Sequence, residues 1–166
     1  MVSLMNSEKK DEASMLAFKK ILFYLKVMKK NITKIDKEKL TVTVAEEIET
    51  VLPPKTINIG ILIIGKWIRI FTLLASRFRL EHYENPAEIL KGLLRLQESY
   101  MEFSFGISKD DELIIKEDIH VDALTLDVFE EEYNAIVGAY IKFREEIIPL
   151  IRESAEITAE KIVEIW

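Results

Sequence analysis

A nearly continuous apolar run from Ile57 to Ala75 constrains this chain more than any other feature. Lys66 and Arg69 lie near its centre, and each would cost about 2.5–3.5 kcal/mol inside a bilayer. Gly65 and Lys66 instead form the expected tight turn of a hairpin. We therefore predict two strands, 56–64 and 67–75, and no membrane span. Since both sides of these strands are apolar, the sheet is either covered on both faces or uses one face for assembly.

The rest of the chain alternates between helical and strand patterns. Before the central hairpin, the patterns predict a helix from Ser7 to Asn31 or Thr33, a strand over 40–44 and a short helical turn over 45–51. After it, they predict a helix from Asn85 to Ser99 and strands over 101–108 and 113–119. A long helix is opened by Thr125 and kinked or broken by Pro149, and a last helix is marked by Ile157, Ile162, Ile165 and Trp166. Asn85 should cap its helix, with Pro86 in the first position and Glu88 completing a capping box.

This order indicates an α+β fold: an antiparallel sheet flanked by helices in the order α-β-β-β-α-β-β-α, with a C-terminal helical extension over 150–166. The length of 166 residues suits a single domain spanning 1–166.

Composition excludes several classes of function. The chain has no cysteine, which excludes disulfides, thiolate zinc sites, iron–sulfur clusters and thiol catalysis. The net charge of −6 disfavours a strongly basic nucleic-acid binder. The first residues lack the apolar segment of a signal peptide, so we expect a cytoplasmic location. Gln97 is the one glutamine, and lysine, glutamate and isoleucine are abundant, which is typical of proteins from hot environments.

Motifs for catalysis are weak. The segment GILIIGKW, residues 60–67, resembles a phosphate-binding loop, but Trp67 stands where Ser or Thr should hold magnesium, and the intervening residues favour a strand. No Gly-x-Ser-x-Gly or His-Glu-x-x-His motif is present. We therefore predict no catalytic residue and no cofactor.

Two clusters leave alternatives open. Asp118, His120 and Asp122 are spaced two apart, so an extended chain would place them on one face, where they could bind a metal or small ligand. The lysines from Lys19 to Lys39 form a basic face that could bind an anion or nucleic acid.

The first helix is apolar over more than one side, as is the central hairpin. Candidate residues for contact with a partner protein come from both segments: Phe18, Leu22, Leu25, Trp67, Ile68 and Ile70. Each of them could equally belong to the internal core.

The stretch from about Asn85 to Ile151 resembles the type III secretion chaperone-like fold, in particular its YbjN-like (sensory transduction regulator) branch. The resemblance is carried by the capped helix NPAEILKGLLRLQ, the hairpin YMEFSFGISKDDELIIKEDI and the segment HVDALTLDVFEEEYNAIVGAYIKFREEIIPLI. It implies a small homodimer with a twisted sheet flanked by helices and without catalytic residues. It also implies binding of a protein partner or client against exposed apolar surface. The chain departs from the family in its apolar central strands and in the added residues 150–166.

Overall fold

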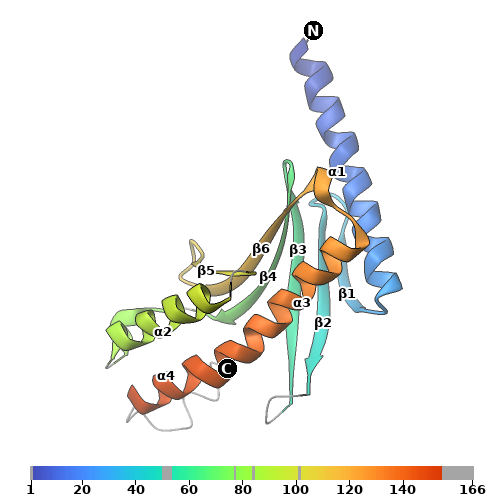
Figure 1. The fold of residues 1–166 in the computed structure, drawn as a ribbon. Coiled ribbons are helices and arrows are strands. Elements are labelled where there is room, and N and C mark those ends of the chain that lie inside the picture. The colour runs from blue at the N-terminus through green and yellow to red at the C-terminus, as the bar shows by residue number, and fades with distance from the viewer. Residues whose placement is uncertain (1, 50–53, 77, 84, 101, 155–166) are drawn as a thin grey trace.

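One antiparallel sheet with helices on one of its faces makes up the protein (Figure 1). The computed structural model describes residues 2–49, 54–76, 78–83, 85–100 and 102–154, with side chains from residue 12 to residue 151 except that of residue 81. The helices are α1 (Val2–Val27), α2 (Pro86–Ser99), α3 (Leu126–Lys142) and α4 (Ile148–Ser154). The strands are β1 (Asn31–Asp36), β2 (Thr41–Ile48), β3 (Lys55–Ile64), β4 (Trp67–Ala75), β5 (Ser104–Ile107) and β6 (Leu113–His120). They pair in the order β1-β2-β3-β4-β6-β5, so the predicted α+β class is confirmed.

The central hairpin forms as predicted. β3 and β4 pair from Ile59↔Thr72 to Ile64↔Trp67. Gly65 makes the turn with φ +59°, a backbone conformation that residues with a Cβ rarely adopt. The apolar run is therefore two strands, and no helix among the described residues is long and apolar enough to cross a bilayer.

The first part of the sheet differs from the prediction in two ways. The first helix begins at Val2 and ends at Val27, because Lys29 takes a left-handed conformation and the Lys30 N–H donates to the carbonyl of Leu25. The released chain forms an additional strand, β1, with a bulge between Ile32 and Lys34. The predicted helical turn over 45–51 is wrong: β2 continues to Ile48, where it pairs with Lys55 of β3, and residues 50–51 lie outside the described part.

The two later helices begin where the sequence places them, with different caps. Thr125 caps α3, and its hydroxyl accepts a hydrogen bond from the Val128 N–H at 3.2 Å. Asn85 precedes α2, but its side chain makes no capping bond. Pro86 still fits the first turn because its missing N–H has no helical acceptor there.

The second predicted hairpin forms with a shorter first strand. β5 covers only Ser104–Ile107 and pairs with β6 from Ser104↔Lys116 to Ile107↔Leu113. Phe103 is buried just before the strand begins. Met101, the first residue of the predicted strand, lies outside the described residues.

Pro149 does not break the last helical segment. A π-helical turn, Phe143–Ile147, joins α3 to α4, and the Ile148 N–H donates to the carbonyl of Phe143. The wider turn comes just before the proline, which has no N–H to donate to the preceding turn. The predicted helix marked by Ile157 lies outside the described residues, and the 1–166 domain boundary stays a prediction.

Candidate protein-binding surface

Among the described residues, no helix covers one of the two faces of the sheet. Along β4 the side chains that face the helices are buried, with Ile68 and Ile70 fully enclosed. The alternate side chains remain accessible, and Trp67 and Leu73 are 50% and 45% exposed. We call this side the open face. Its apolar residues come from β3, β4 and β6: Leu62, Ile64, Trp67, Phe71, Leu73 and Ile114.

Cross-strand pairing joins these residues into one patch. Ile64 lies opposite Trp67, and Leu73 lies opposite Ile114. The ring of Phe71 lies over Gly60, where an added Cβ would be 2.5 Å from the ring. The glycine therefore lets an aromatic side chain lie flat on the sheet. An exposed antiparallel sheet face is usually polar, so an apolar one indicates a contact surface.

An ion pair lies in the middle of the open face. Arg69 donates two hydrogen bonds to Asp118 from the neighbouring strand, each at 2.8 Å. The hydrogen bond from Arg69 and its positive charge lower the pKa of Asp118. Both side chains are only part-buried, so the ion pair contributes little to the stability of the fold. Its main effect is to place a polar group within the apolar patch.

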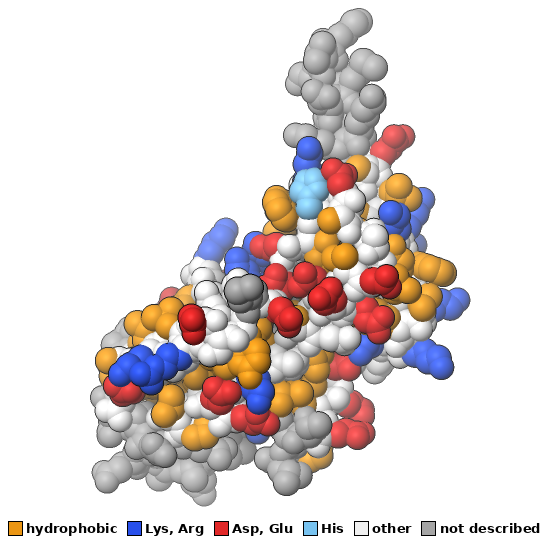
Figure 2. All heavy atoms as spheres, in the orientation of Figure 1, with side chains coloured by type: hydrophobic (Ala, Val, Ile, Leu, Met, Phe, Trp, Pro, Cys, Tyr) orange, Lys and Arg blue, Asp and Glu red, His pale blue; other side chains and the backbone are white. Residues whose placement is uncertain are grey.

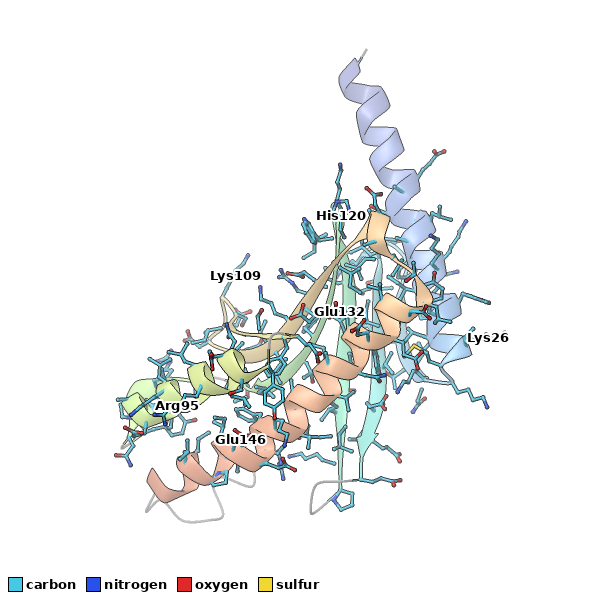
Figure 3. The ribbon with its side chains drawn as sticks, in the orientation of Figure 1. Lys26, Arg95, Lys109, His120, Glu132 and Glu146 are labelled. Atoms are coloured by element: carbon cyan, nitrogen blue, oxygen red, sulfur yellow. The ribbon has the colours of Figure 1, made fainter. Side chains whose placement is uncertain are left out.

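The three residues of the proposed metal or ligand site do not converge. The Asp122 carboxylate lies 3.6 Å from the Nδ1 of His120, which accepts a hydrogen bond from the Asp122 N–H at 3.3 Å, but Asp118 is bonded to Arg69 instead. The His120 ring packs edge-on against Trp67, with ring centroids 5.1 Å apart. His120 lies at the far end of the molecule from Arg95 and Glu146 (Figure 3). Within the described ranges, no group of three or more His, Cys, Asp or Glu side chains is placed to hold a metal ion.

The six predicted contact residues fall into two groups. Phe18, Leu25, Ile68 and Ile70 are at most 2% exposed and pack inside the subunit. A partner could reach them only if α1 moved away from the sheet. Leu22 is half-buried, and Trp67 is half-exposed on the open face. The binding role of the six stays a prediction, and the structure favours Trp67 among them.

Sequence reasoning missed the other members of the patch. The sequence predicts these five only as strand residues: Leu62, Ile64, Phe71, Leu73 and Ile114. Their signal is the small number of polar residues at the alternate positions of β3 and β4, where only Thr56, Asn58 and Arg69 are polar; this indicates a second, largely apolar face without showing which residues form it.

Carboxylates gather on the opposite, helix-covered side (Figure 2). Glu117 of β6 lies under α3, where burial and the charge of Glu132 raise its pKa to about 7. Burial and the charges of Glu131 and Glu102 raise the pKa of Glu132. Beside them a cleft of about 490 Å³ runs between Tyr100, Phe103 and the small residues of α3. Perturbed carboxylates also occur in catalytic sites, but neither Glu117 nor Glu132 lines this cleft, and Lys142 from its lining is bonded to Glu145 at 2.9 Å.

The resemblance to a phosphate-binding loop is not supported by the backbone. Residues 60–64 are the end of β3, and residues 65–66 lead into another strand. A phosphate loop needs a helix N-terminus at this point to offer its N–H groups.

No protein-family model and no curated protein matches this sequence. A chain from the solved structure of the HopA1-SchA chaperone–effector complex is similar in fold, with a TM-score of 0.54 at 14% identity. The similarity covers 80% of this chain and 96% of that chain. At this identity the likeness shows the fold alone, and it confirms the predicted secretion chaperone-like fold. The YbjN-like branch within that fold stays a prediction.

Proposed function

We propose that this protein is a non-enzymatic, chaperone-like module that binds an apolar segment of a partner or client protein on its open face. The observation that carries the proposal is the uncovered apolar patch on β3, β4 and β6. Burying a large apolar side chain from water contributes about 1.5–3 kcal/mol, so a client that covers several of these side chains would bind without any catalytic group. The similar chain from a chaperone–effector complex supports a role in protein binding.

The ion pair at the centre of the patch adds a constraint on the client. Arg69 and Asp118 are bonded to each other, and Lys116 lies 3.9 Å from the same carboxylate, so the cluster carries one excess positive charge that a client must leave in water or pair with a carboxylate. The apolar side chains around the pair then supply the affinity. A client that places an unpaired charge against the pair would bind more weakly.

A homodimer, as the resemblance implies, is part of the proposal. α2 buries Ile89, Leu93 and Leu96 but leaves Leu90 and Leu94 exposed at 45% and 58%. Residues four apart lie on the same side of a helix, so these two leucines present a contact surface to a second copy. The cytoplasmic location stays a prediction, and so do metal binding near His120 and anion binding by the Lys19–Lys39 face.

Glutamate substitutions on the open face test the function. We expect Ile64→Glu with Leu73→Glu to reduce binding of an apolar fluorescent dye and to abolish protection of a chemically unfolded model protein from aggregation. Ile35→Glu is the control, because Ile35 is similarly exposed at 46% but lies on the edge strand β1. If the control loses as much activity as the double variant, with both proteins folded by circular dichroism, the open face is not the binding surface.

A further inference from the structure

We propose that the outer stripe of α1, formed by Leu16, Phe23 and Val27, binds an acidic amphipathic helix of a partner protein. This inference rests on the proposed protein-binding function, but it concerns a different surface. The stripe lies on a helix, whereas the open face lies on the uncovered side of the sheet.

The stripe is defined by the helical spacing of its residues. At about 100° of rotation per residue, Leu16, Phe23 and Val27 fall within about 40° of one another around the helix axis. They are 58%, 61% and 48% exposed. Phe23 and Val27 are neighbours one turn apart, and Leu16 lies two turns before Phe23 with Lys19 and Lys20 between them, so the stripe is an apolar row interspersed with lysines.

The opposite side of the same helix belongs to the core. Phe18, Ile21 and Leu25 are buried, and Tyr24 packs against Phe129 of α3 with ring centroids 5.9 Å apart. α1 is therefore held in place by one apolar side while it presents the other outward. A helix that is already fixed loses little conformational freedom when a partner binds.

Lysines border the stripe on both sides. By the same rotation per residue, Lys19 and Lys26 flank one edge and Lys20 flanks the other. All three side chains are exposed, and Lys26 projects away from the sheet (Figure 3). Glu12 is the one described carboxylate near the stripe, one turn before its first leucine. An apolar row between lysines is complementary to an apolar row between glutamates or aspartates.

The dimensions indicate a short helix as the occupant. From Leu16 to Val27 the helix rises about 17 Å, which is about three turns. A partner helix of the same length can match the three apolar residues and place acidic side chains opposite the lysines on both edges.

Two other occupants fit less well. A second copy docking by the same stripe would bring the lysines of the two copies together. An anionic lipid surface would attract the lysines, but only a single row of apolar side chains can insert, because the other side of α1 is held by the fold. Both occupants are outcomes of the test below.

The test measures binding of three designed helical peptides to the full-length protein by fluorescence anisotropy. The first carries leucines at i, i+4, i+7 and i+11 with glutamates at their flanks, the second replaces the glutamates by lysines, and the third replaces the leucines by serines. We expect only the first peptide to bind. Phe23→Ala should weaken its binding at least about tenfold, the equivalent of burying about half of a large aromatic side chain. Ile107→Ala, at a site 57% exposed on β5, is the matched control and should leave Kd unchanged.

Charge reversal separates this inference from the general function. We expect Lys19→Glu with Lys20→Glu and Lys26→Glu to lose the acidic peptide and to bind the lysine peptide, with dye binding to the open face unchanged. Equal binding of all three peptides, or no effect of Phe23→Ala, overturns the inference. The inference is also overturned if the protein binds no peptide but binds phosphatidylcholine–phosphatidylserine vesicles. The same holds if it binds no peptide but self-associates in a way that Phe23→Ala prevents. If Ile64→Glu with Leu73→Glu loses dye binding while the α1 variants keep it, the proposed function of the open face is supported whatever the peptide result. The peptide result then decides the inference about α1 separately.

Discussion

Two carboxylates on the helix-covered side of the sheet show how much a single residue depends on its neighbours. Glu46 of β2 accepts hydrogen bonds from Lys30 at 2.9 Å and from the Tyr133 hydroxyl at 2.8 Å. Burial and the hydrogen bond to Glu46 raise the pKa of Tyr133, so its hydroxyl keeps its proton. Glu117 lies under the same helix but faces Glu132. The same residue type is thus stabilising at one position and costly at the other.

Glu117→Gln is expected to make the protein more stable at pH 8 but not at pH 4.5. The pKa of Glu117 is raised from 4.5 to about 7, so below pH 4.5 the folded and unfolded states both hold the proton. Between pH 4.5 and about 7 only the folded state holds it, and the free energy of unfolding falls as the pH rises. Allowing for the half-exposed side chain, we expect a gain of about 1 kcal/mol at pH 8. Urea unfolding at the two pH values measures it.

Glu47→Gln is the control for that prediction, since Glu47 is exposed on β2 and an exposed substitution should change the free energy of unfolding by less than about 0.5 kcal/mol. Glu46→Gln should act in the opposite direction and destabilise the protein at neutral pH, because it weakens the bonds to Lys30 and Tyr133. A uniform effect of all three substitutions would show that the local partners do not govern these carboxylates.

Among the elements, the hairpin β3–β4 and the long helix α3 use glycine for different reasons. Gly65 needs its left-handed backbone to close the tight turn, although nothing lies within 4 Å of the position of an added Cβ. Gly138 of α3 is in ordinary helical conformation and also has open space around it. Backbone conformation alone therefore separates the two sites.

Gly65→Ala is expected to destabilise the protein by about 1–2 kcal/mol, since alanine is strained in the left-handed conformation. Gly138→Ala should stabilise it by up to about 1 kcal/mol, because alanine favours a helix over the unfolded chain. Thermal and urea unfolding of the two single variants check the opposite signs. Destabilisation by Gly138→Ala would mean that the absence of a side chain at this position matters for the cleft beside α3.

At the scale of the molecule, the apolar surfaces lie on separate elements. The open face belongs to the sheet, the outer stripe to α1, and the exposed leucines to α2. Three separate surfaces allow a dimer and two kinds of partner contact in one small protein. Their separation also allows each contact to be removed without changing the others.

Leu94→Glu is expected to convert the proposed dimer into a monomer, since it places a charge in an apolar contact between the two copies of α2. Light scattering coupled to size-exclusion chromatography measures the mass of both proteins. Glu88→Gln, an exposed change at the start of the same helix, is the control and should remain dimeric. A natural protein that is monomeric at high concentration would contradict the dimer directly.

The local features of the fold were predictable from the sequence. The turn at Gly65, the start of α2 after Asn85 and the cap at Thr125 each depend on residues within one turn of the chain. The strand β1 and the second half of β2 were not predicted, because Asn31–Asp36 has a weak pattern and Glu46 and Glu47 are polar. The pairing of β1 with β2, and of β2 with the more distant β3, decides their structure.

The candidate surface was predicted only in outline. An excess of apolar residues in the first helix and central hairpin indicated a contact surface, and Trp67 lies on it. Phe18, Leu25, Ile68 and Ile70 lie in the core instead, because the side that a residue faces depends on which helices pack where. Residue type and spacing are the same for a buried and an exposed isoleucine on one strand.

The sequence by itself determined the antiparallel α+β class, the absence of cysteine chemistry and the presence of more apolar surface than one side of the sheet needs. These follow from periodicity and composition, which are local properties of the chain. The tertiary structure alone decided that the described helices cover one side of the sheet and leave the other side open, and that Glu46 contacts a lysine while Glu117 lies near another carboxylate. Each of these depends on contacts between residues far apart in sequence. Both sides of the central strands are apolar, so no local pattern shows which side of the sheet the helices will cover.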